Sequence, residues 1–335
     1  MKAALFPVVF SLLICAAAPA VAARYDVQEL EMLGEAINDA GQIVGAVSTA
    51  DGSSHASLYS NGATTDLGTF GEHYSRATAI NASGQIAGSY GVAAAGAQAF
   101  LYSAGSVSRL LTQGGSGRNR AVSITASGKV LIDTEVLFAT KPGSHVAIYD
   151  NGNVTEIPEL GGRQATATDM NDSGQVCGYF RVVASGDHAF LYEQGELHDL
   201  GTLGGNFSAA SSINAAGAVV GWSELAYGKS RHAFLYANHQ MVDLGTLDGG
   251  DTFARAINNS NQIVGRAVST AKVSTAFVYE RGRMIDLNSL LRTQLPGKFR
   301  LGDAIAINNS GQILAEGFRV AAGKRERRTY LLTPH

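Results

Sequence analysis

The sequence predicts an all-β protein, a seven-bladed β-propeller of four-stranded antiparallel blades. A first observation is a phrase of the type INxxGQIVG, whose seven copies start 43, 44, 46, 43, 44 and 50 residues apart. Periods of about 40–50 residues are typical of propeller blades and of helical arrays. A second observation is that Gly, Asn and Ser interrupt every repeat after a few residues, which favours short strands over helices. The copies start at Ile37, Ile80, Ile124, Met170, Ile213, Ile257 and Ile307.

The N-terminal segment precedes the repeats and has the pattern of a secretory signal peptide. Lys2 is followed by an apolar run and by small residues at positions 20–23. Pro7 and Pro19 leave too short an uninterrupted stretch for a membrane span of about 20 residues. A lipoprotein signal at Cys15 is disfavoured because Ile14 is not small. We therefore expect residues 1–22 to be removed, and the mature protein to be secreted or periplasmic and without a transmembrane segment.

Four strands are expected in each repeat. The first ends at the Ile-Asn pair and turns through a short loop such as NASG, in which Gly supplies a positive φ. The second is the run QIVG and the third is HAFLY or a close variant. Asn61-Gly62 and Asn151-Gly152 then predict two-residue hairpin turns into a fourth strand that ends in DLG. Four such strands make one propeller blade.

The two ends of the chain predict how the ring closes. The last repeat stops at TYLLTPH, after its third strand, whereas YDVQELEMLG at residues 25–34 aligns with the fourth-strand phrase ELHDLGTLGG at 196–205. We expect this N-terminal strand to complete the last blade, which removes the open sheet edges of an unclosed ring. Residues 23–335 then form a single domain.

The composition predicts an exported domain without disulfide bonds. Removal of Lys2 changes the formal charge from −3 to −4, which argues against nucleic acid or an anionic membrane as partner. Cys177 is the one cysteine after residue 22, so no intrachain disulfide can form. About 310 residues are ample for a hydrophobic core. We expect a monomer.

The phrases HAFLY, DLGTLGG and INxxGQIVG together resemble the HAF family of probable extracellular repeat proteins. The resemblance covers essentially all of residues 23–335. It is strongest in the second, fourth and fifth repeats and weakest in the third, where Thr125 replaces Asn. The resemblance implies export and a repetitive fold, and it brings no assigned reaction and no catalytic residues.

The repeated polar residues are expected to serve the repeat rather than chemistry. The histidines begin the third strands of different blades, so the ring separates them, and we expect them to bond to neighbouring strand ends. Metal-binding motifs are absent, and no cofactor is expected. Cys177 lies within a strand and is expected to be a buried hydrophobe. The repeated residues are His55, His145, His188 and His232, with Asp66, Asp199, Asp243 and Asp286.

The candidate site is the mouth of the central channel on the face that carries the long, variable loops. Binding residues concentrate on loops held by a rigid scaffold, and the opposite face carries only tight turns. Counting back by two and by four from the repeated Ile places Arg76, Arg120, Arg255 and Asp303 at this mouth. The repeat does not require these charges. They predict a small anionic or polyhydroxylated ligand; the alternative is solvated charge at the rim.

Three functions are compatible with these features of the sequence. The favoured one is a non-enzymatic binding scaffold that uses the loop face for a glycan, a peptide or an envelope protein. The second is an extracytoplasmic lyase or glycoside hydrolase at the channel mouth, for which Glu35, Asp303 and Asp169 are the available acids. The third is a purely structural surface protein.

Overall fold

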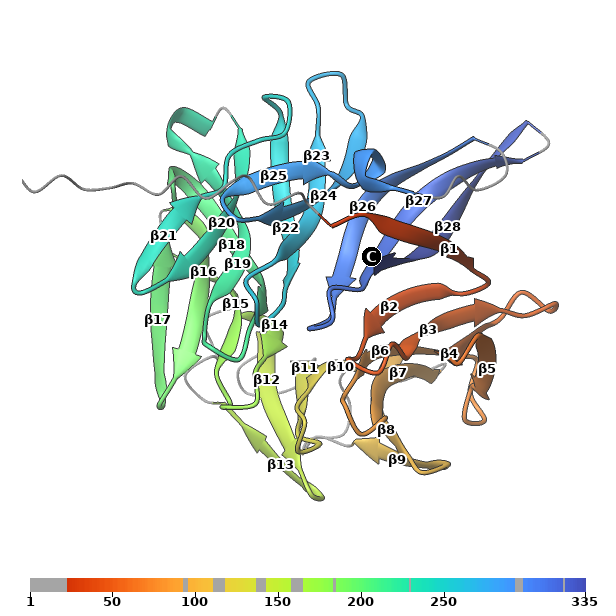
Figure 1. Cartoon of the computed structure of the whole chain (residues 1–335). Coiled ribbons are helices and arrows are strands. Elements are labelled where there is room, and N and C mark those ends of the chain that lie inside the picture. The colour runs from red at the N-terminus through yellow and green to blue at the C-terminus, as the bar shows by residue number, and fades with distance from the viewer. Residues whose placement is uncertain are drawn as a thin grey trace, which may run out of the picture.

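The computed structural model describes residues 23–92, 96–110, 118–136, 143–157, 165–182, 185–228, 230–292, 298–321 and 323–335. The expected signal peptide lies outside these residues. Seven four-stranded antiparallel sheets stand around a common axis, which confirms the predicted seven-bladed β-propeller (Figure 1). Within the described residues, no helix is long and apolar enough to cross a membrane.

The blades follow the repeats in order. Blade 1 contains β2 (Leu33–Ile37), β3 (Ile43–Ser48), β4 (Ser54–Ser60) and β5 (Ala63–Gly68); blade 2 contains β6 (Tyr74–Ile80), β7 (Ile86–Val92), β8 (Gly96–Ser103) and β9 (Ser106–Leu110). Blade 3 contains β10 (Arg118–Ile124), β11 (Val130–Val136), β12 (Gly143–Asp150) and β13 (Asn153–Glu156). Blade 4 contains β14 (Thr166–Met170), β15 (Val176–Val182), β16 (Gly186–Glu193) and β17 (Glu196–Gly201).

The remaining blades complete the ring. Blade 5 contains β18 (Gly204–Ile213), β19 (Val219–Leu225), the short 3₁₀ helix η1 (Ala226–Gly228), β20 (Arg231–Ala237) and β21 (Gln240–Asp243). Blade 6 contains β22 (Asp251–Ile257), β23 (Ile263–Val268), β24 (Ser274–Glu280) and β25 (Arg283–Asp286), followed by the 3₁₀ helix η2 (Leu287–Leu290). Blade 7 contains β26 (Lys298–Ile307), β27 (Ile313–Ala321), β28 (Lys324–Pro334) and β1 (Tyr25–Leu30).

The N-terminal strand closes the ring as predicted. β1 pairs antiparallel with β28, from Tyr25 opposite Pro334 to Leu30 opposite Thr329, and the two strands lie side by side in Figure 1. The N–H of His335 also donates to the carbonyl of Arg24 at 2.9 Å. Residues 25–30 and 324–334 are thus held in one sheet.

Each interface between blades has its own hydrophobic core. The Phe of the HAFLY phrase lies within it: Phe100 is fully buried against Val44 of blade 1 and Ala77 of blade 2. Phe190, Phe234 and Phe277 are buried in the same way in later blades. The repeated aromatic residue therefore provides the apolar contact that stacks one blade on the next.

A β-bulge interrupts the innermost strand of every blade, and the sequence analysis missed it. In blade 2, Ala77 pairs with Gly88 and Ala79 with Ala87, so Thr78 is the extra residue. A Cβ at Gly88 would lie 2.2 Å from the carbonyl oxygen of Arg76, which explains the glycine there. The counting back by two and four from the repeated Ile assumed that side chains alternate strictly between the two faces of the strand. That assumption was wrong at the bulge, because a bulge redirects the residues that follow it. The corresponding extra residues are Glu35, Val122, Thr168, Ser211, Arg255 and Ile305.

The phrases HAFLY and DLG meet in a hydrogen-bond network at the loop face. In blade 4, His188 Nδ1 contacts the Asp199 carboxylate at 2.9 Å, and Asp199 Oδ1 accepts from the N–H of Gly201 at 2.8 Å. The carbonyl of Gly201 accepts from Ser208 Oγ, which in turn accepts from the N–H of Ala189. The network therefore joins strands three and four to the first strand of the next blade. Blades 1 and 5 repeat it with His55, Asp66, Gly68, Ser75 and Ala56, and with His232, Asp243, Gly245, Thr252 and Ala233.

Candidate functional site

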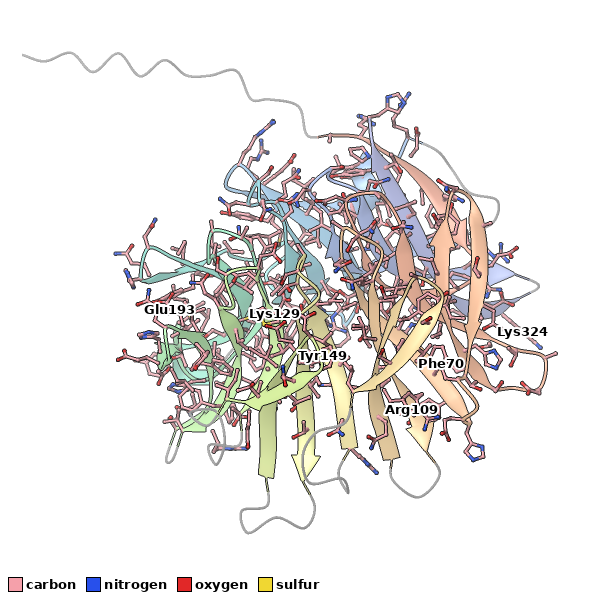
Figure 2. All side chains as sticks on the ribbon, turned by 90° about the horizontal axis from the view of Figure 1, so that it is seen from below. Phe70, Arg109, Lys129, Tyr149, Glu193 and Lys324 are labelled. Atoms are coloured by element: carbon pink, nitrogen blue, oxygen red, sulfur yellow. The ribbon has the colours of Figure 1, made fainter. Side chains whose placement is uncertain are left out.

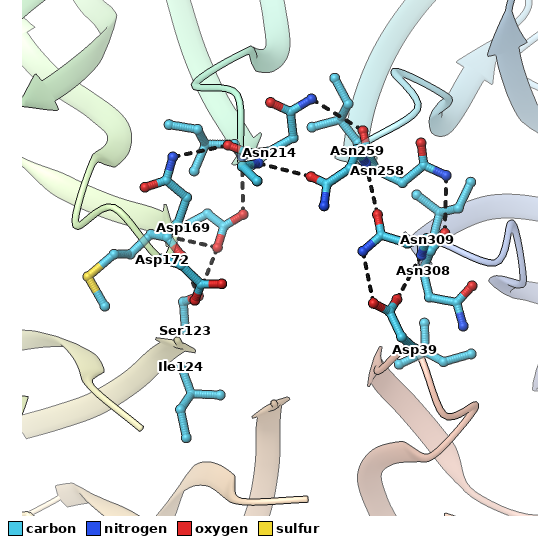
Figure 3. A pocket seen from close by; sticks show the side chains of 17 residues that line it. Asp39, Ser123, Ile124, Asp169, Asp172, Asn214, Asn258, Asn259, Asn308 and Asn309 are labelled. Atoms are coloured by element: carbon cyan, nitrogen blue, oxygen red, sulfur yellow. Dashed lines mark hydrogen bonds between the residues drawn. The ribbon is translucent and has the colours of Figure 1, made fainter. Parts of the chain in front are cut away.

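The channel has two chemically different ends. At one end, which we call the turn end, the first strands finish in the Asn-containing turns. A hollow of about 290 Å³ lies there on the axis (Figure 3), lined by residues of six blades. Its polar wall includes Asp39, Asp169, Asp172, Asn258, Asn259 and Asn309.

The asparagines of the turn end form an inter-blade ring. Asn81 shows the pattern: its Oδ1 accepts from the N–H of Gln85 within the turn, and its Nδ2 donates to the carbonyl of Thr125 in the next blade at 3.0 Å. Because these amides bond both within a blade and across blades, they hold the ring together. The other cross-blade bonds run from Asn38 to Asn81, Asn171 to Asn214, Asn214 to Asn258, Asn258 to Asn308 and Asn308 to Asn38, at 2.9 to 3.3 Å.

The ring is interrupted at blade 3, where Thr125 lacks the amide. Two carboxylates bridge the gap between blades 3 and 4. Asp172 Oδ1 accepts from the N–H of Ala126 at 2.7 Å, and Asp169 accepts from Ser123 Oγ at 2.8 Å. These bonds compensate for the missing asparagine.

Asp169 is the most enclosed acid at the turn end. Besides Ser123, it accepts from Ser212 Oγ at 2.9 Å and from the N–H groups of Met170 and Ile213. Burial raises the pKa of the Asp169 carboxyl, and these donors oppose the rise. These four hydrogen bonds connect the Asp169 carboxylate to residues of blades 3, 4 and 5. The structure therefore gives Asp169 a structural contact rather than the free position that a hydrolase would need.

The other end, which we call the loop mouth, holds the four predicted ligand-binding residues. Arg255 donates to both oxygens of Asp303 in the next blade, with a closest distance of 2.9 Å. Arg76 pairs with Glu35 of blade 1, and Arg120 pairs with Asp133 of its own blade at 3.2 Å. The structure thus brings Arg255 and Asp303 together and gives Arg76 and Arg120 separate acidic partners.

Exposure differs among these residues. The side chains of Arg76 and Arg120 are 52% and 57% exposed, whereas Asp303 is 14% exposed. Burial raises the pKa of the Asp303 carboxyl, and the nearby Arg255 and Arg266 oppose the rise. Sequence reasoning found Glu35 but missed Asp133 and Arg266, because both lie on second strands, which the counting from the repeated Ile does not include.

Three of the repeated histidines, His55, His188 and His232, bond to an aspartate on the neighbouring fourth strand, as expected. Two of them also complete a Ser-His-Asp row: Ser185 Oγ lies 3.2 Å from His188 Nε2, and Ser53 Oγ lies 3.1 Å from His55 Nε2. The same His-Asp pair occurs in blade 5 at His232, whose ring makes no hydrogen bond to a serine among the described residues. The pair therefore belongs to the repeat. The side chain of His145 lies outside the described part. Asp286 also accepts from the N–H two residues on, that of Asn288 at the start of η2, but Thr275 stands where the other blades have the histidine.

Metal and thiol chemistry find no support in the described side chains. Nowhere in that part of the chain do three His, Cys, Asp or Glu side chains gather closely enough to hold a metal ion. Cys177 is fully buried, and burial raises the pKa of its thiol. A buried, protonated thiol is a poor nucleophile.

Comparisons with known proteins agree with the fold. No family model and no curated protein matches the chain. The β-propeller domain of the Trilobed protease from Pyrococcus furiosus is similar at a TM-score of 0.58, with 12% identity over 92% of this chain and 95% of that one. TolB from Acinetobacter baumannii has a TM-score of 0.48 with 11% identity, over 93% of this chain and 97% of that one. A six-bladed propeller, the Aleuria aurantia lectin, has a TM-score of 0.40 with 13% identity, over 76% and 94%.

At these identities the similarity extends to the fold alone. The chain is a seven-bladed β-propeller closed by its N-terminal strand.

Proposed function

We propose that this protein is an exported, non-enzymatic binding scaffold of the HAF type, with a ligand site at the loop mouth. The observation that carries the proposal is the contrast between the two channel ends. Polar groups at the turn end are occupied by bonds that nearly every blade repeats. The loop mouth instead carries half-exposed charges that differ from blade to blade.

The arginines of the loop mouth can bind a ligand while they keep their acidic partners. A guanidinium has five N–H donors, and the contacts of Arg120 with Asp133 and of Arg76 with Glu35 each involve one nitrogen, Nη2. Ion pairs at such exposure contribute only about 0–1 kcal/mol, so an incoming anion can compete with them.

The charges of the loop mouth indicate the class of ligand. The arginines alternate with Glu35, Asp133 and Asp303, so donors and acceptors lie close together. Such a mixture suits a polyhydroxylated molecule, whose hydroxyl groups both donate and accept. A glycan is therefore favoured over a simple anion, although an anionic substituent would gain from the arginines.

The acids of the loop mouth support binding rather than hydrolysis. A glycoside hydrolase needs a carboxyl that carries a proton to the leaving group. Arg255 donates to both oxygens of Asp303, which favours the unprotonated carboxylate and opposes the rise in the pKa of Asp303 that burial causes. Glu35 is engaged by Arg76.

A thermal-shift screen tests the proposal. The purified protein is heated with neutral and acidic oligosaccharides and with sulfate and citrate at low and high salt, because a bound ligand raises apparent stability. We expect a ligand whose shift is lost in Arg76→Ala/Arg120→Ala. Lys129→Ala is the matched control, since Lys129 is an exposed cation that pairs with Asp150 at 3.1 Å beside the turns of the opposite face. A ligand that binds the double arginine variant normally and fails on the lysine variant would overturn the assignment.

A further inference from the structure

A second hollow lies on the loop face, at the outer junction of blades 6 and 7. It measures about 250 Å³ and does not include any of the residues proposed at the loop mouth. Blade 6 contributes the turn before β24, and blade 7 contributes β26, β27 and β28. We call it the basic groove; its lining residues are Lys272, Val273, Ser274, Arg300, Gly302, Phe318 and Arg325.

The groove exists because one hairpin is longer than its neighbours. β1 pairs only with residues 329–334 of β28, so the part of the β27–β28 hairpin beyond residue 329 toward its tip has no outer neighbour. This hairpin projects from the ring in Figure 1, and Lys324 near its tip lies at the edge of the molecule in Figure 2. Antiparallel pairing sets Phe318 opposite Arg300 and Val320 opposite Arg325, so these four side chains share one sheet face.

The cations of the groove are not neutralised. Among the described residues, no carboxylate pairs with Lys272, Arg300 or Arg325. The acids on the hairpin are already engaged, since Glu326 pairs with Arg328 and Arg319, and Glu316 pairs with Arg327. Three cations around one hollow therefore create a positive potential. This distinguishes the groove from the loop mouth, where each proposed arginine has an acid.

Two of these cations are already positioned. Arg300 Nη2 donates to Thr275 Oγ1 at 2.5 Å. The guanidinium carbon of Arg325 lies 3.8 Å from the centre of the Phe318 ring. A guanidinium stacked on an aromatic ring keeps its edge donors available for a carboxylate, which it can bind with two parallel hydrogen bonds.

The groove also exposes apolar surface beside these charges. Phe318 is 37% exposed, Val273 is 46% exposed and the neighbouring Val320 is 44% exposed. A simple inorganic anion would leave this surface uncovered. The ligand should therefore carry an anionic group together with a compact apolar face, as a sugar ring does with its C–H groups.

We infer that the basic groove binds an acidic sugar, one that carries a carboxylate such as a uronate. Arg300, Arg325 and Lys272 receive the carboxylate, and Phe318 and Val273 contact the ring. Its volume of about 250 Å³ is just below the range of about 300–1,000 Å³ of ordinary ligand pockets, which suits a small molecule of one or two rings. An acidic peptide is less suited, because it would bind most readily as an added strand on β28, whose free edge carries a run of charges that discourages strand addition.

Calorimetric titration with di- and trigalacturonate tests this inference, with the matching neutral galacto-oligosaccharides as controls. We expect the acidic sugars alone to bind the basic groove, with an affinity that falls as salt rises. Arg300→Ala/Arg325→Ala should weaken binding roughly tenfold or more, as expected for loss of charged hydrogen bonds. Phe318→Ala should weaken it by a smaller factor. Circular dichroism confirms that each variant is folded.

The controls separate this site from the loop mouth. Arg231→Ala removes a comparable arginine, which stacks on Trp222 at 4.9 Å but pairs with Glu224, and should leave binding unchanged. Arg76→Ala/Arg120→Ala should also leave uronate binding at the groove intact. In the Arg76→Ala/Arg120→Ala background, equal affinity for neutral sugars, or normal uronate binding after the further change Arg300→Ala/Arg325→Ala, would overturn the inference. Binding of a poly-glutamate peptide in place of the uronates would assign the groove to an acidic polypeptide instead.

Discussion

Asn308 donates from its side-chain amide to the carbonyl oxygen of Asn38, 2.9 Å away, across the junction between the last blade and the first. The two residues are 270 positions apart in the chain. At the same junction Asn309 donates to Asp39, and at the opposite side of the blade β1 completes the sheet of β28. The ring is thus closed twice, by a strand at its outside and by amides at its axis.

The strand closure predicts a large effect of deletion. Removing Tyr25–Leu30 leaves β28 paired with β27 alone, so that β28 becomes the open edge of its sheet. The deletion also exposes the apolar residues that pack against Tyr25 and Leu30. We expect a fall in melting temperature of roughly 10 °C or more, together with association through the open edge. Thermal melts and size-exclusion chromatography with light scattering measure both. A monomer with wild-type melting would contradict the closure by β1.

The amide closure predicts a smaller effect of a point change. Asn308→Ala removes the bond to Asn38 and those that its side chain makes within its turn to Gln312. We expect the free energy of unfolding to fall by about 1–3 kcal/mol. Denaturant unfolding measures it, with Asn309→Ala as the control that leaves the innermost amide ring intact. Equal losses of unfolding free energy in the two variants would mean that the cross-blade bond of Asn308 adds no more stability than the contact of Asn309 with Asp39.

The interrupted position predicts a stabilising change. Thr125→Asn supplies the amide that blade 3 lacks and would allow a bond to the carbonyl of Asn171. We expect the free energy of unfolding to rise by up to about 1 kcal/mol. The same denaturant experiment applies. Destabilisation would show that the contacts of Asp169 and Asp172 exclude an amide at this position.

Asp169 predicts a dependence of stability on pH. Burial raises its pKa in the folded protein above the unfolded value of about 3.9. The folded state therefore holds the proton more tightly, and this contribution is fully present below the unfolded pKa and is lost as pH rises through the folded pKa. We expect the unfolding free energy of the wild type, relative to Asp169→Asn, to fall as the pH rises above the unfolded pKa of about 3.9. A relative rise over the same range would mean that the four hydrogen bonds outweigh burial.

The repeated histidines predict loss of stability without loss of binding. His188→Ala breaks the contact with Asp199 at the loop face. We expect a loss of about 1 kcal/mol in unfolding free energy and an unchanged affinity for any ligand of the loop mouth. Paired denaturation and binding experiments decide this. Normal stability with lost binding would make His188 a site residue.

The sequence was sufficient for the fold because its evidence is periodic. Seven copies of INxxGQIVG define the blades, and the alignment of YDVQELEMLG with the fourth-strand phrase defines the closure. The details of the candidate site were less accessible. A bulge at Thr78 and its equivalents has no strong sequence signal, and Arg120 pairs with Asp133 because the register of β10 and β11 sets the two residues opposite each other.

The basic groove shows the same limit. Of its three cations, Arg325 lies in the charged run GKRERR at 323–328, whereas Lys272 and Arg300 come from other segments of the chain. The groove itself depends on the register that sets Phe318 beside Arg300 and on how far β28 extends past β1. Both are long-range properties, which a local pattern does not reveal.

The central claim is that the loop face, and not the turn face, binds the ligand. Hydrogen–deuterium exchange with the tightest oligosaccharide or anion from the thermal screen tests it most directly. We expect added protection in segments of the loop face, at residues 33–36, 74–78 and 118–122 for the loop mouth, or at 272–274 and 298–302 for the basic groove. The Asn turns at 38–42, 171–175 and 308–312 should exchange as in the free protein. Protection confined to those turns would place the ligand at the opposite end of the channel and contradict the account.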